Sequence, residues 1–393
     1  MSDVKSIKQE LIKSSLYTTV LTAIFLFFIW EKSNLIEVVY STLFFIVLYF
    51  TLFTVGKPAV GSYLRKQIDY SVYKVGVIPV VILLLYYLYL YITGQNPFTD
   101  MNMLLPFFIL FPAFVFSSKV KVGKDYDWLD FTIFVMFLLP ITLITLETKS
   151  EIPLDGNGFD SFYRIMILIT AVYAFVVVRG VKDVGFFPEF QLKKLWRAIW
   201  VWLLFYSSIF IFAVSVNFLK YKGHDVVDSA LFLKIFKKLL TTFLHVALFE
   251  ELFFRGLLQN MLQKRISQSS NWKMFWLFAA GILVALSLAT GYLMDGGMSY
   301  FPALVSLLLF VAAWFIEKAK FDKTGTYTAL AISSVIFGLV HYHSGSIIFV
   351  GLAAIGGWAY GYTYIKTKNV FYAALVHTLV NTSALMFGLE LAK

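Results

Sequence analysis

The chain has 393 residues, of which 60% are hydrophobic and only 14% are charged. Soluble domains carry about 25% charged residues, so this composition excludes an ordinary soluble protein and indicates a membrane protein. The absence of cysteine excludes disulfide bonds and thiolate metal sites or nucleophiles. A net charge of +10 would usually suggest nucleic-acid binding. Here the basic residues lie in loops between apolar runs, so we expect no nucleic-acid partner.

Apolar runs of about 17–25 residues, the length that crosses a bilayer, recur along the whole chain. They predict an all-α fold, a polytopic transmembrane helix bundle of about thirteen spans. The predicted spans are 15–31, 35–55, 73–93, 102–117, 128–147, 161–178, 197–217, 240–261, 273–294, 300–316, 326–341, 346–365 and 370–389. No small-residue cleavage site follows Trp30, so we interpret the first run as a span rather than a signal peptide.

Lysine and arginine are concentrated in every second loop between these spans. The basic groups lie near 5–13, 57–74, 119–124, 179–197, 264–273, 318–323 and 366–368. By the positive-inside rule we expect a cytoplasmic N-terminus and an external C-terminus. The predicted location is the cytoplasmic (plasma) membrane of a prokaryote, as an integral multi-pass protein. Lys234, Lys237 and Lys238 break the rule, and we interpret residues 231–240 as an amphipathic helix in the outer interface.

A polar stretch over 182–194 separates six predicted spans from seven. It predicts an N-terminal multispan membrane region over 1–190 and a second membrane domain over 191–393. The first region contains no histidine, whereas all five histidines lie in the second. We therefore interpret the first region as scaffold and look for the chemistry in the second.

Three charged residues, Glu250, Glu251 and Arg255, lie inside the eighth predicted span. Each charge at the centre of a membrane helix costs ~2.5–3.5 kcal/mol on insertion scales, so the three need a compensating reason. Glu251 and Arg255 are four residues apart, which predicts an ion pair that supports the helix. Glu250 is turned ~100° away from Glu251 and has no such local partner. A carboxylate of this kind at membrane depth is a candidate functional group.

Two later spans carry the other polar groups. His341 follows Phe337 by four residues, and Asn381 follows His377 by four, so each pair shares a helix face. A carboxylate, two imidazoles and an amide suit hydrolysis of an amide bond by water, with a base for the water proton and donors for the oxyanion. The set Glu250, His341 and His377 could instead hold Zn²⁺ with water as the fourth ligand. The sequence leaves both possibilities open.

The ordered motifs Glu250-Glu251-x-x-x-Arg255, Phe337-x-x-x-His341 and His377-x-x-x-Asn381 resemble those of the CPBP (Abi) family of intramembrane proteases, which includes the type II CAAX prenyl endopeptidases. The resemblance covers about 240–389 and extends to Gly357-x-x-x-Gly361, where we expect a close helix-packing face. It implies a glutamate- or metal-dependent endopeptidase that acts, within the lipid bilayer, on a membrane-embedded or lipid-anchored substrate. That substrate would be a prenylated CAAX-type protein or a peptide precursor. The implied catalytic residues are Glu250, His341, His377 and Asn381, with Glu251 and Arg255 as structural support.

Two predicted spans, 273–294 and 300–316, lie between Arg255 and Phe337, where the family has one short loop. We interpret 270–325 as an inserted two-span segment in an otherwise CPBP-like catalytic domain. An even number of inserted spans preserves the orientation of the later helices. The alternatives are a multispan transporter with a buried Glu/His proton relay and a catalytically silent immunity or scaffold protein. The complete motif set, confined to one half of the chain, favours the enzyme.

Overall fold

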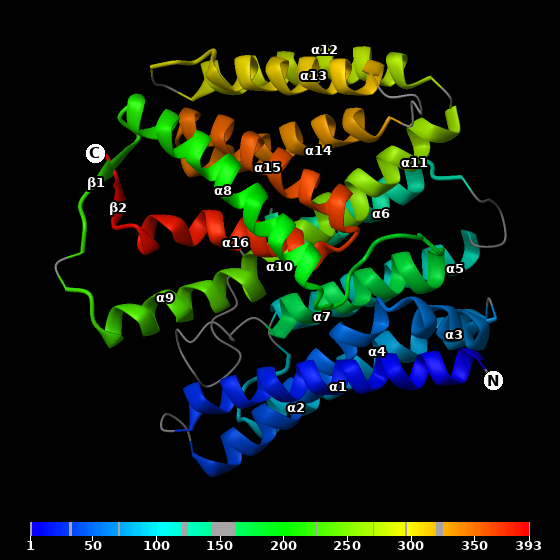
Figure 1. Ribbon diagram of the computed structural model, residues 1–393. Helices are drawn as coiled ribbons and strands as arrows, with labels where there is room; N and C mark the ends of the chain where they lie inside the picture. Colours follow the sequence, from blue (N-terminus) through cyan, green and yellow to red (C-terminus); the bar gives the residue numbers. More distant parts are fainter. Residues whose placement is uncertain are drawn as a thin grey trace. The chain divides into compact units, whose positions relative to one another are not determined.

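The computed structural model describes residues 2–30, 34–69, 71–98, 100–119, 125–142, 162–224, 226–269, 271–294, 297–319 and 325–392. These residues are almost entirely helical, which confirms the predicted all-α polytopic bundle (Figure 1). Seven helices in this part of the chain are long and apolar enough to cross a membrane, and three further apolar helices are shorter. The chain is an integral membrane protein. The number of thirteen spans stays a prediction, and residues 31, 143–147 and 161 of the predicted spans lie outside the described residues.

The chain folds into two compact units, which we describe separately. Unit 1 comprises Met1–Glu189 and the short segment Leu244–Phe249. Unit 2 comprises Phe190–Phe243 and Glu250–Lys393.

Unit 1 is a set of apolar helices around an aromatic core. Its elements are α1 (Ser2–Ile29), α2 (Leu35–Val55), α3 (Pro58–Ile68), α4 (Val72–Ile92), α5 (Asp100–Lys119), α6 (Trp128–Thr142), α7 (Phe162–Val172) and the π-helix η1 (Tyr173–Arg179). Helix α1 packs along α2, and η1 packs against α3 and α5. Phe45 stacks on Phe25 with ring centroids 4.2 Å apart and contacts Tyr49 at 4.3 Å.

One end of unit 1 is fixed by two buried or partly buried arginines. Arg179 pairs with Asp130 (Nε to Oδ1, 2.6 Å), and both side chains are buried. Arg65 donates from Nε to the carbonyl oxygen of Val177 at 2.9 Å, which satisfies a carbonyl near the end of η1. Because the Asp130–Arg179 charges are paired and fully hydrogen-bonded, we interpret this cluster as structural.

Unit 2 contains the remaining elements. They are α8 (Leu192–Ser215), β1 (Leu219–Tyr221), α9 (Ser229–Thr241), the π-helix η2 (Thr242–Ala247, shared with unit 1), α10 (Leu248–Glu251), the π-helix η3 (Leu252–Gln259), α11 (Asn260–Ser269), α12 (Trp272–Leu293), α13 (Phe301–Ala319), α14 (Thr326–Val340), the 3₁₀ helix η4 (His341–Ser344), α15 (Ile347–Thr367), α16 (Val370–Met386) and β2 (Leu389–Leu391). Helix α15 is central, because it packs against α8, α13, α14 and α16.

Helices α12 and α13 correspond to the two spans that the sequence analysis interprets as an insertion. They lie side by side, drawn in yellow, next to α14 and α15 (Figure 1). A hydrogen bond between the hydroxyls of Ser287 and Ser306, 2.7 Å long, joins the two helices. The indole Nε1 of Trp276 also donates to the carbonyl oxygen of Phe310 at 2.7 Å. The pair is therefore an integral part of the packing of unit 2.

Helix α13 also caps α14, the helix that leads into the Phe-x-x-x-His motif. The buried carboxylate of Glu317, near the end of α13, accepts hydrogen bonds from the backbone N–H groups of Gly325 and Tyr327 (3.0 Å to Tyr327). The first N–H groups of a helix have no partner within the helix, and the helix dipole favours a negative charge beside them. Glu317 therefore fixes the start of α14, which ends next to His341.

We expect the Glu317→Ala variant to lose about 2–3 kcal/mol of unfolding free energy, because it removes a charged acceptor and leaves buried N–H groups unpaired. Chemical denaturation in detergent micelles measures this loss. The Glu317→Gln variant keeps one side-chain oxygen as an acceptor and should lose less unfolding free energy. Lys318→Ala is the control, because Lys318 is exposed on the next position. Equal stability of the two alanine variants would show that the cap does not matter.

Two contacts define the two ends of unit 2. Strands β1 and β2, which the sequence analysis did not predict, pair antiparallel with Leu219 opposite Leu391, so α8 and α16 finish at the same end. At the other end, Arg197 donates from Nη1 to the carbonyl oxygen of Lys366 at 3.2 Å. The basic residues near 193–197 and 366–368 thus share one end of the unit. Which end faces the cytoplasm stays a prediction.

Candidate functional site

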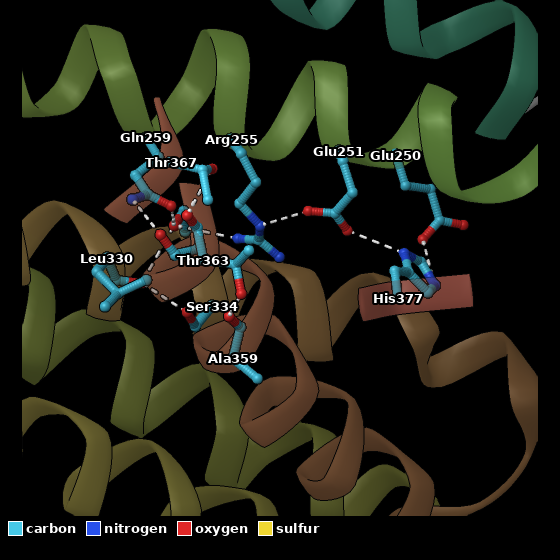
Figure 2. Close-up of polar contacts among 12 residues, drawn as sticks. Glu250, Glu251, Arg255, Gln259, Leu330, Ser334, Ala359, Thr363, Thr367 and His377 are labelled. Atoms are coloured by element: carbon cyan, nitrogen blue, oxygen red, sulfur yellow. Dashed lines mark hydrogen bonds and ion pairs between the residues drawn. The ribbon is translucent and has the colours of Figure 1, made fainter. Parts of the chain in front are cut away.

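The Glu-Glu-x-x-x-Arg motif lies where the α-helical turn α10 passes into the π-helix η3. π-helical turns are rare and occur frequently at functional sites. Figure 2 shows Glu250, Glu251, Arg255 and Gln259 in sequence along this helix, with the carboxylates of both glutamates directed toward His377 of α16. The sequence spacing and the local helix type together present these polar groups to one side of the helix.

Glu251 and Arg255 form the ion pair that their spacing predicts. Nε of Arg255 lies 2.9 Å from Oε2 of Glu251, and both side chains are fully buried. Arg255 also donates from Nη1 to the hydroxyl of Ser333 at 3.3 Å. Its guanidinium carbon lies 5.1 Å from the centre of the Phe337 ring, within the range of a cation–π contact. The charge of Arg255 is thus balanced by a carboxylate, a hydroxyl and an aromatic face.

His377 is the residue around which the other site groups gather. Its Nδ1 lies 2.9 Å from Oε1 of Glu251, and its Nε2 lies 3.1 Å from Nδ2 of Asn381 and 3.9 Å from Oε2 of Glu250. The ring stacks on Tyr360 with centroids 4.5 Å apart and an interplanar angle of 8°. A carboxylate can only accept, so Nδ1 carries a proton toward Glu251, and Nε2 accepts from the Asn381 amide when the ring is neutral.

Glu250 differs from Glu251 in its surroundings. About a quarter of the Glu250 side chain is exposed (25%), whereas Glu251 is completely buried. Within the part of the chain that the structure describes, Oε2 of Glu250 is buried and has no hydrogen-bond partner. Of the two carboxylates, Glu250 therefore has acceptor capacity left for another molecule, and Glu251 is already committed to Arg255 and His377.

His341 lies just beyond the last turn of α14 rather than within it. Its Nδ1 donates to the carbonyl oxygen of Phe337 at 2.7 Å, which leaves Nε2 with the lone pair in the neutral ring. The Phe337 ring lies between the two histidines, with its centroid 4.7 Å from that of His341 and 5.7 Å from that of His377. Among the described residues, no hydrogen bond or ion pair joins His341 to Glu250 or His377.

The arrangement does not fit the zinc site that the sequence leaves open. No group of three His, Cys, Asp or Glu side chains in the described ranges could hold a metal ion. Both ring nitrogens of His377 have other partners, Glu251 and Asn381. Within the described ranges, no hydrogen bond or ion pair joins His341, the third residue of that set, to Glu250 or His377. We therefore derive no catalytic step through a metal.

The structure adds two polar residues that the sequence analysis did not single out. Ser333 on α14 and Gln259 on η3 lie 3.4 Å apart (Oγ to Oε1), and Ser333 contacts Arg255 as described above. Gln259 is 2% exposed and donates from Nε2 to the carbonyl oxygen of Gly361 at 3.3 Å. The sequence did contain a signal for Gln259, because Gln259 follows Arg255 by four residues, the same spacing that separates Arg255 from Glu251.

Gly357 and Gly361 on α15 leave room for these side chains. A Cβ atom on Gly361 would lie 2.5 Å from Oε1 of Gln259, and one on Gly357 would lie 3.3 Å from Nη2 of Arg255 and 3.2 Å from the Cα of Ser334. The close approach of α15 to α14 confirms the predicted packing face. The same two glycines also accommodate the Arg255 guanidinium and the Gln259 amide, which the sequence analysis did not foresee.

Comparison with known proteins matches this part of the chain to a family. The model of the family described as "Type II CAAX prenyl endopeptidase Rce1-like" matches residues 232–321 and 309–383. The Bacillus subtilis (strain 168) protein named "Putative membrane peptidase YdiL" is 32% identical over 72 residues. That match covers 18% of this chain and 28% of the relative. No solved structure matches the chain.

Proposed function

We propose, on the premise that residues 232–383 belong to the Rce1-like family of the CPBP proteases, that this chain is an intramembrane endopeptidase. Its substrate would be a membrane-embedded or lipid-anchored peptide or protein, of the prenylated CAAX type or a peptide precursor. One observation carries the proposal: among the described residues, Oε2 of Glu250 has no hydrogen-bond partner, and it lies beside a histidine that Glu251 and Asn381 hold in place.

Glu250 would act as the general base. A water molecule that donates to the unpartnered Oε2 would lie within reach of both Glu250 and Nε2 of His377, which are 3.9 Å apart. Transfer of its proton to the carboxylate produces the hydroxide equivalent that attacks the scissile carbonyl carbon. The protonated Glu250 then donates that proton to the leaving amine when the C–N bond breaks. A general base of this kind typically contributes 10²–10⁴-fold, as an order-of-magnitude figure.

His377 and Asn381 would bind the oxyanion of the tetrahedral intermediate. The amide of Asn381 has two N–H groups, of which one donates to Nε2 of His377 and the second is available to the substrate. When His377 is protonated, Nε2 becomes a second donor, and the adjacent Glu251 carboxylate stabilises the imidazolium. The sequence analysis expected both residues to point at one place. In the structure Asn381 and His377 are also hydrogen-bonded to each other. The substrate carbonyl must therefore displace that hydrogen bond or accept from the second N–H of Asn381.

The remaining polar residues would position these groups. Glu251 orients His377 through Nδ1, Arg255 fixes Glu251, and Ser333 with Gln259 fixes Arg255. This chain of hydrogen bonds connects η3, α14 and α16. His341 would orient the attacking water through the lone pair on Nε2, since its Nδ1 is held by Phe337. None of these roles requires the side chain itself to form a bond to the substrate.

We expect the Asn381→Ala variant to lower turnover by about 10²–10³-fold with little change in KM, because loss of one oxyanion donor acts mainly in the transition state. Steady-state kinetics on the substrate found by the proteomic experiment below measures both constants. Ser383→Ala is the matched control, because Ser383 lies on α16 like Asn381, and its hydroxyl accepts a hydrogen bond from the indole of Trp202 on α8 rather than from a site residue. Near-normal turnover in Asn381→Ala would rule out the oxyanion role.

A comparison of membrane proteomes tests the proposed activity itself. Cells that express the wild-type chain are compared with cells that express Glu250→Ala at equal level, and new peptide termini are identified in the membrane fraction. We expect at least one membrane-associated peptide that only the wild type cuts. Glu390→Ala serves as the control, because Glu390 lies on strand β2 and pairs with Lys220 and Lys222 rather than with a residue of the site motifs. If the same peptide termini were found in all strains, the proposal would be contradicted.

A further inference from the structure

One end of unit 2 has a surface that the proposed reaction does not use. This surface, which we term the 219–241 surface, consists of β1, the described residues that follow it, and α9. Its exposed apolar side chains are Tyr221, Val226, Val227, Phe232, Leu233 and Phe236. Its lysines are Lys220, Lys222, Lys234, Lys237 and Lys238. Lys237 is half-buried, and the other four lysines are exposed beside these large apolar side chains over a short stretch of chain.

Helix α9 separates the two kinds of side chain. Asp228 caps the helix by accepting from the N–H of Leu231 at 2.9 Å. At 100° per residue, Phe232, Leu233 and Phe236 fall on one side, Lys234 and Lys238 fall on the opposite side, and Lys237 lies between them, next to Leu233. None of the residues of α9 is buried, although its remaining flank packs against α16. Phe232 is 64% exposed and Phe236 is 45% exposed, so an apolar strip of the helix faces outward.

The position of this surface decides which partner it suits. The β1–β2 ribbon places it at the end of unit 2 opposite the contact between Arg197 and Lys366, and hence opposite the basic loops of this unit. Glu390 balances part of the charge, because it pairs with Lys220 at 3.0 Å and Lys222 at 3.3 Å. Helix α9 packs against α16, which finishes at this end of the unit, and there we expect the headgroups of a bilayer.

We propose that the 219–241 surface binds anionic phospholipid headgroups. Phe232, Leu233 and Phe236 enter the boundary between headgroups and acyl chains, and Lys234, Lys237 and Lys238 contact the lipid phosphates. A helix with one apolar strip and a lysine-rich opposite side has the chemistry of an interfacial helix. Each lysine near an anionic surface shifts the equilibrium between docked and undocked helix by about fivefold at moderate salt. A lipid surface accounts for the apolar and the basic side chains together.

The absence of cysteine in the chain makes a direct test practical, because a single introduced thiol is the only labelling site. Phe236→Cys and Lys234→Cys are each labelled with an environment-sensitive fluorophore in the full-length protein. The protein is placed in nanodiscs of phosphatidylcholine alone, or of equal parts phosphatidylcholine and phosphatidylglycerol. Quenching by a water-soluble agent is compared with quenching by lipids that carry a nitroxide near the headgroup. Ile282→Cys on the outward face of α12 provides the reference for a label in the hydrocarbon.

In the anionic nanodiscs we expect the label at 236 to be quenched more strongly by the nitroxide lipid, and less strongly by the aqueous agent, than the label at 234. Replacing Lys234, Lys237 and Lys238 by glutamine, in the Phe236→Cys background, should shift the docked-to-undocked ratio by about a hundredfold. High salt should act in the same direction.

Three results would overturn the proposal. The first is equal aqueous quenching at 236 and 234 in anionic nanodiscs. The second is protection at 236 that is unchanged by lipid charge and by the lysine replacements. The third is protection at 236 from the aqueous agent without quenching by the nitroxide lipid, which would indicate that protein, such as a second copy of the chain, covers this side of α9.

Discussion

The Glu250→Gln variant should fold as the wild type does and lose peptide-bond hydrolysis by about 10²–10⁴-fold or more, because the carboxamide cannot take the proton of the attacking water. Normal folding is expected because Oε2 of Glu250 has no hydrogen-bond partner among the described residues, and a quarter of the side chain is exposed. The measurement is turnover of the peptide identified by the membrane-proteome comparison, together with thermal unfolding of the purified variant.

Glu251→Gln is the matched control for that experiment, since it makes the same chemical change one residue further along the helix. Glu251 is fully buried and pairs with both Arg255 and His377, so this variant should lose stability as well as activity. The two glutamates are then distinguished by the stability measurement rather than by activity alone. Undiminished turnover in Glu250→Gln would remove Glu250 from the reaction and with it the proposed mechanism.

The Arg255→Ala variant should lose about 3–5 kcal/mol of unfolding free energy, because it leaves the Glu251 carboxylate charged, buried and without its partner. The loss is expected to be large because Arg255 also contacts Ser333 and the ring of Phe337, and no part of its side chain reaches solvent. Denaturation in detergent micelles, followed by intrinsic tryptophan fluorescence, measures the change.

Arg265→Ala is the appropriate comparison for Arg255→Ala, because Arg265 is an exposed arginine on α11, which follows η3 directly. It should leave stability close to the wild-type value. A double variant that replaces both Glu251 and Arg255 by apolar residues of similar size should recover part of the lost stability. If Arg255→Ala is as stable as Arg265→Ala yet inactive, Arg255 takes part in the reaction and does not merely support Glu251.

The sequence predicted those features that depend on neighbours along the chain. Long apolar runs can satisfy their backbone groups in a bilayer only as helices, so they indicated the helical membrane fold directly. The Glu251–Arg255 pair was also predictable, because residues four apart on one helix are in contact whatever the rest of the fold does. The order of the three motifs indicated the family, which the comparison of residues 232–383 supports.

The features that join distant segments were decided only by the tertiary structure. His377 reaches Glu251 across 126 positions, and nothing in either local sequence states which of the two glutamates it contacts. His341 was placed on a helix face by its spacing, yet it lies past the end of α14, where the backbone no longer follows the helical period. Glu317 was interpreted only as part of the inserted segment 270–325, and its role as the cap of α14 depends on where α13 ends in space.

By itself, therefore, this amino-acid sequence determined that the protein is a bundle of membrane helices, and it indicated which side chains are candidates for its chemistry. Apolar periodicity and i,i+4 spacing are local properties, and they are fixed before the helices pack. Only the tertiary structure decided which of those side chains bond to one another and which stay available. Packing of α10, η3, α14, α15 and α16 commits Glu251 to Arg255 and His377, and it leaves the carboxylate of Glu250 available. Such a division between two adjacent glutamates arises from distances between helices, which no local pattern encodes.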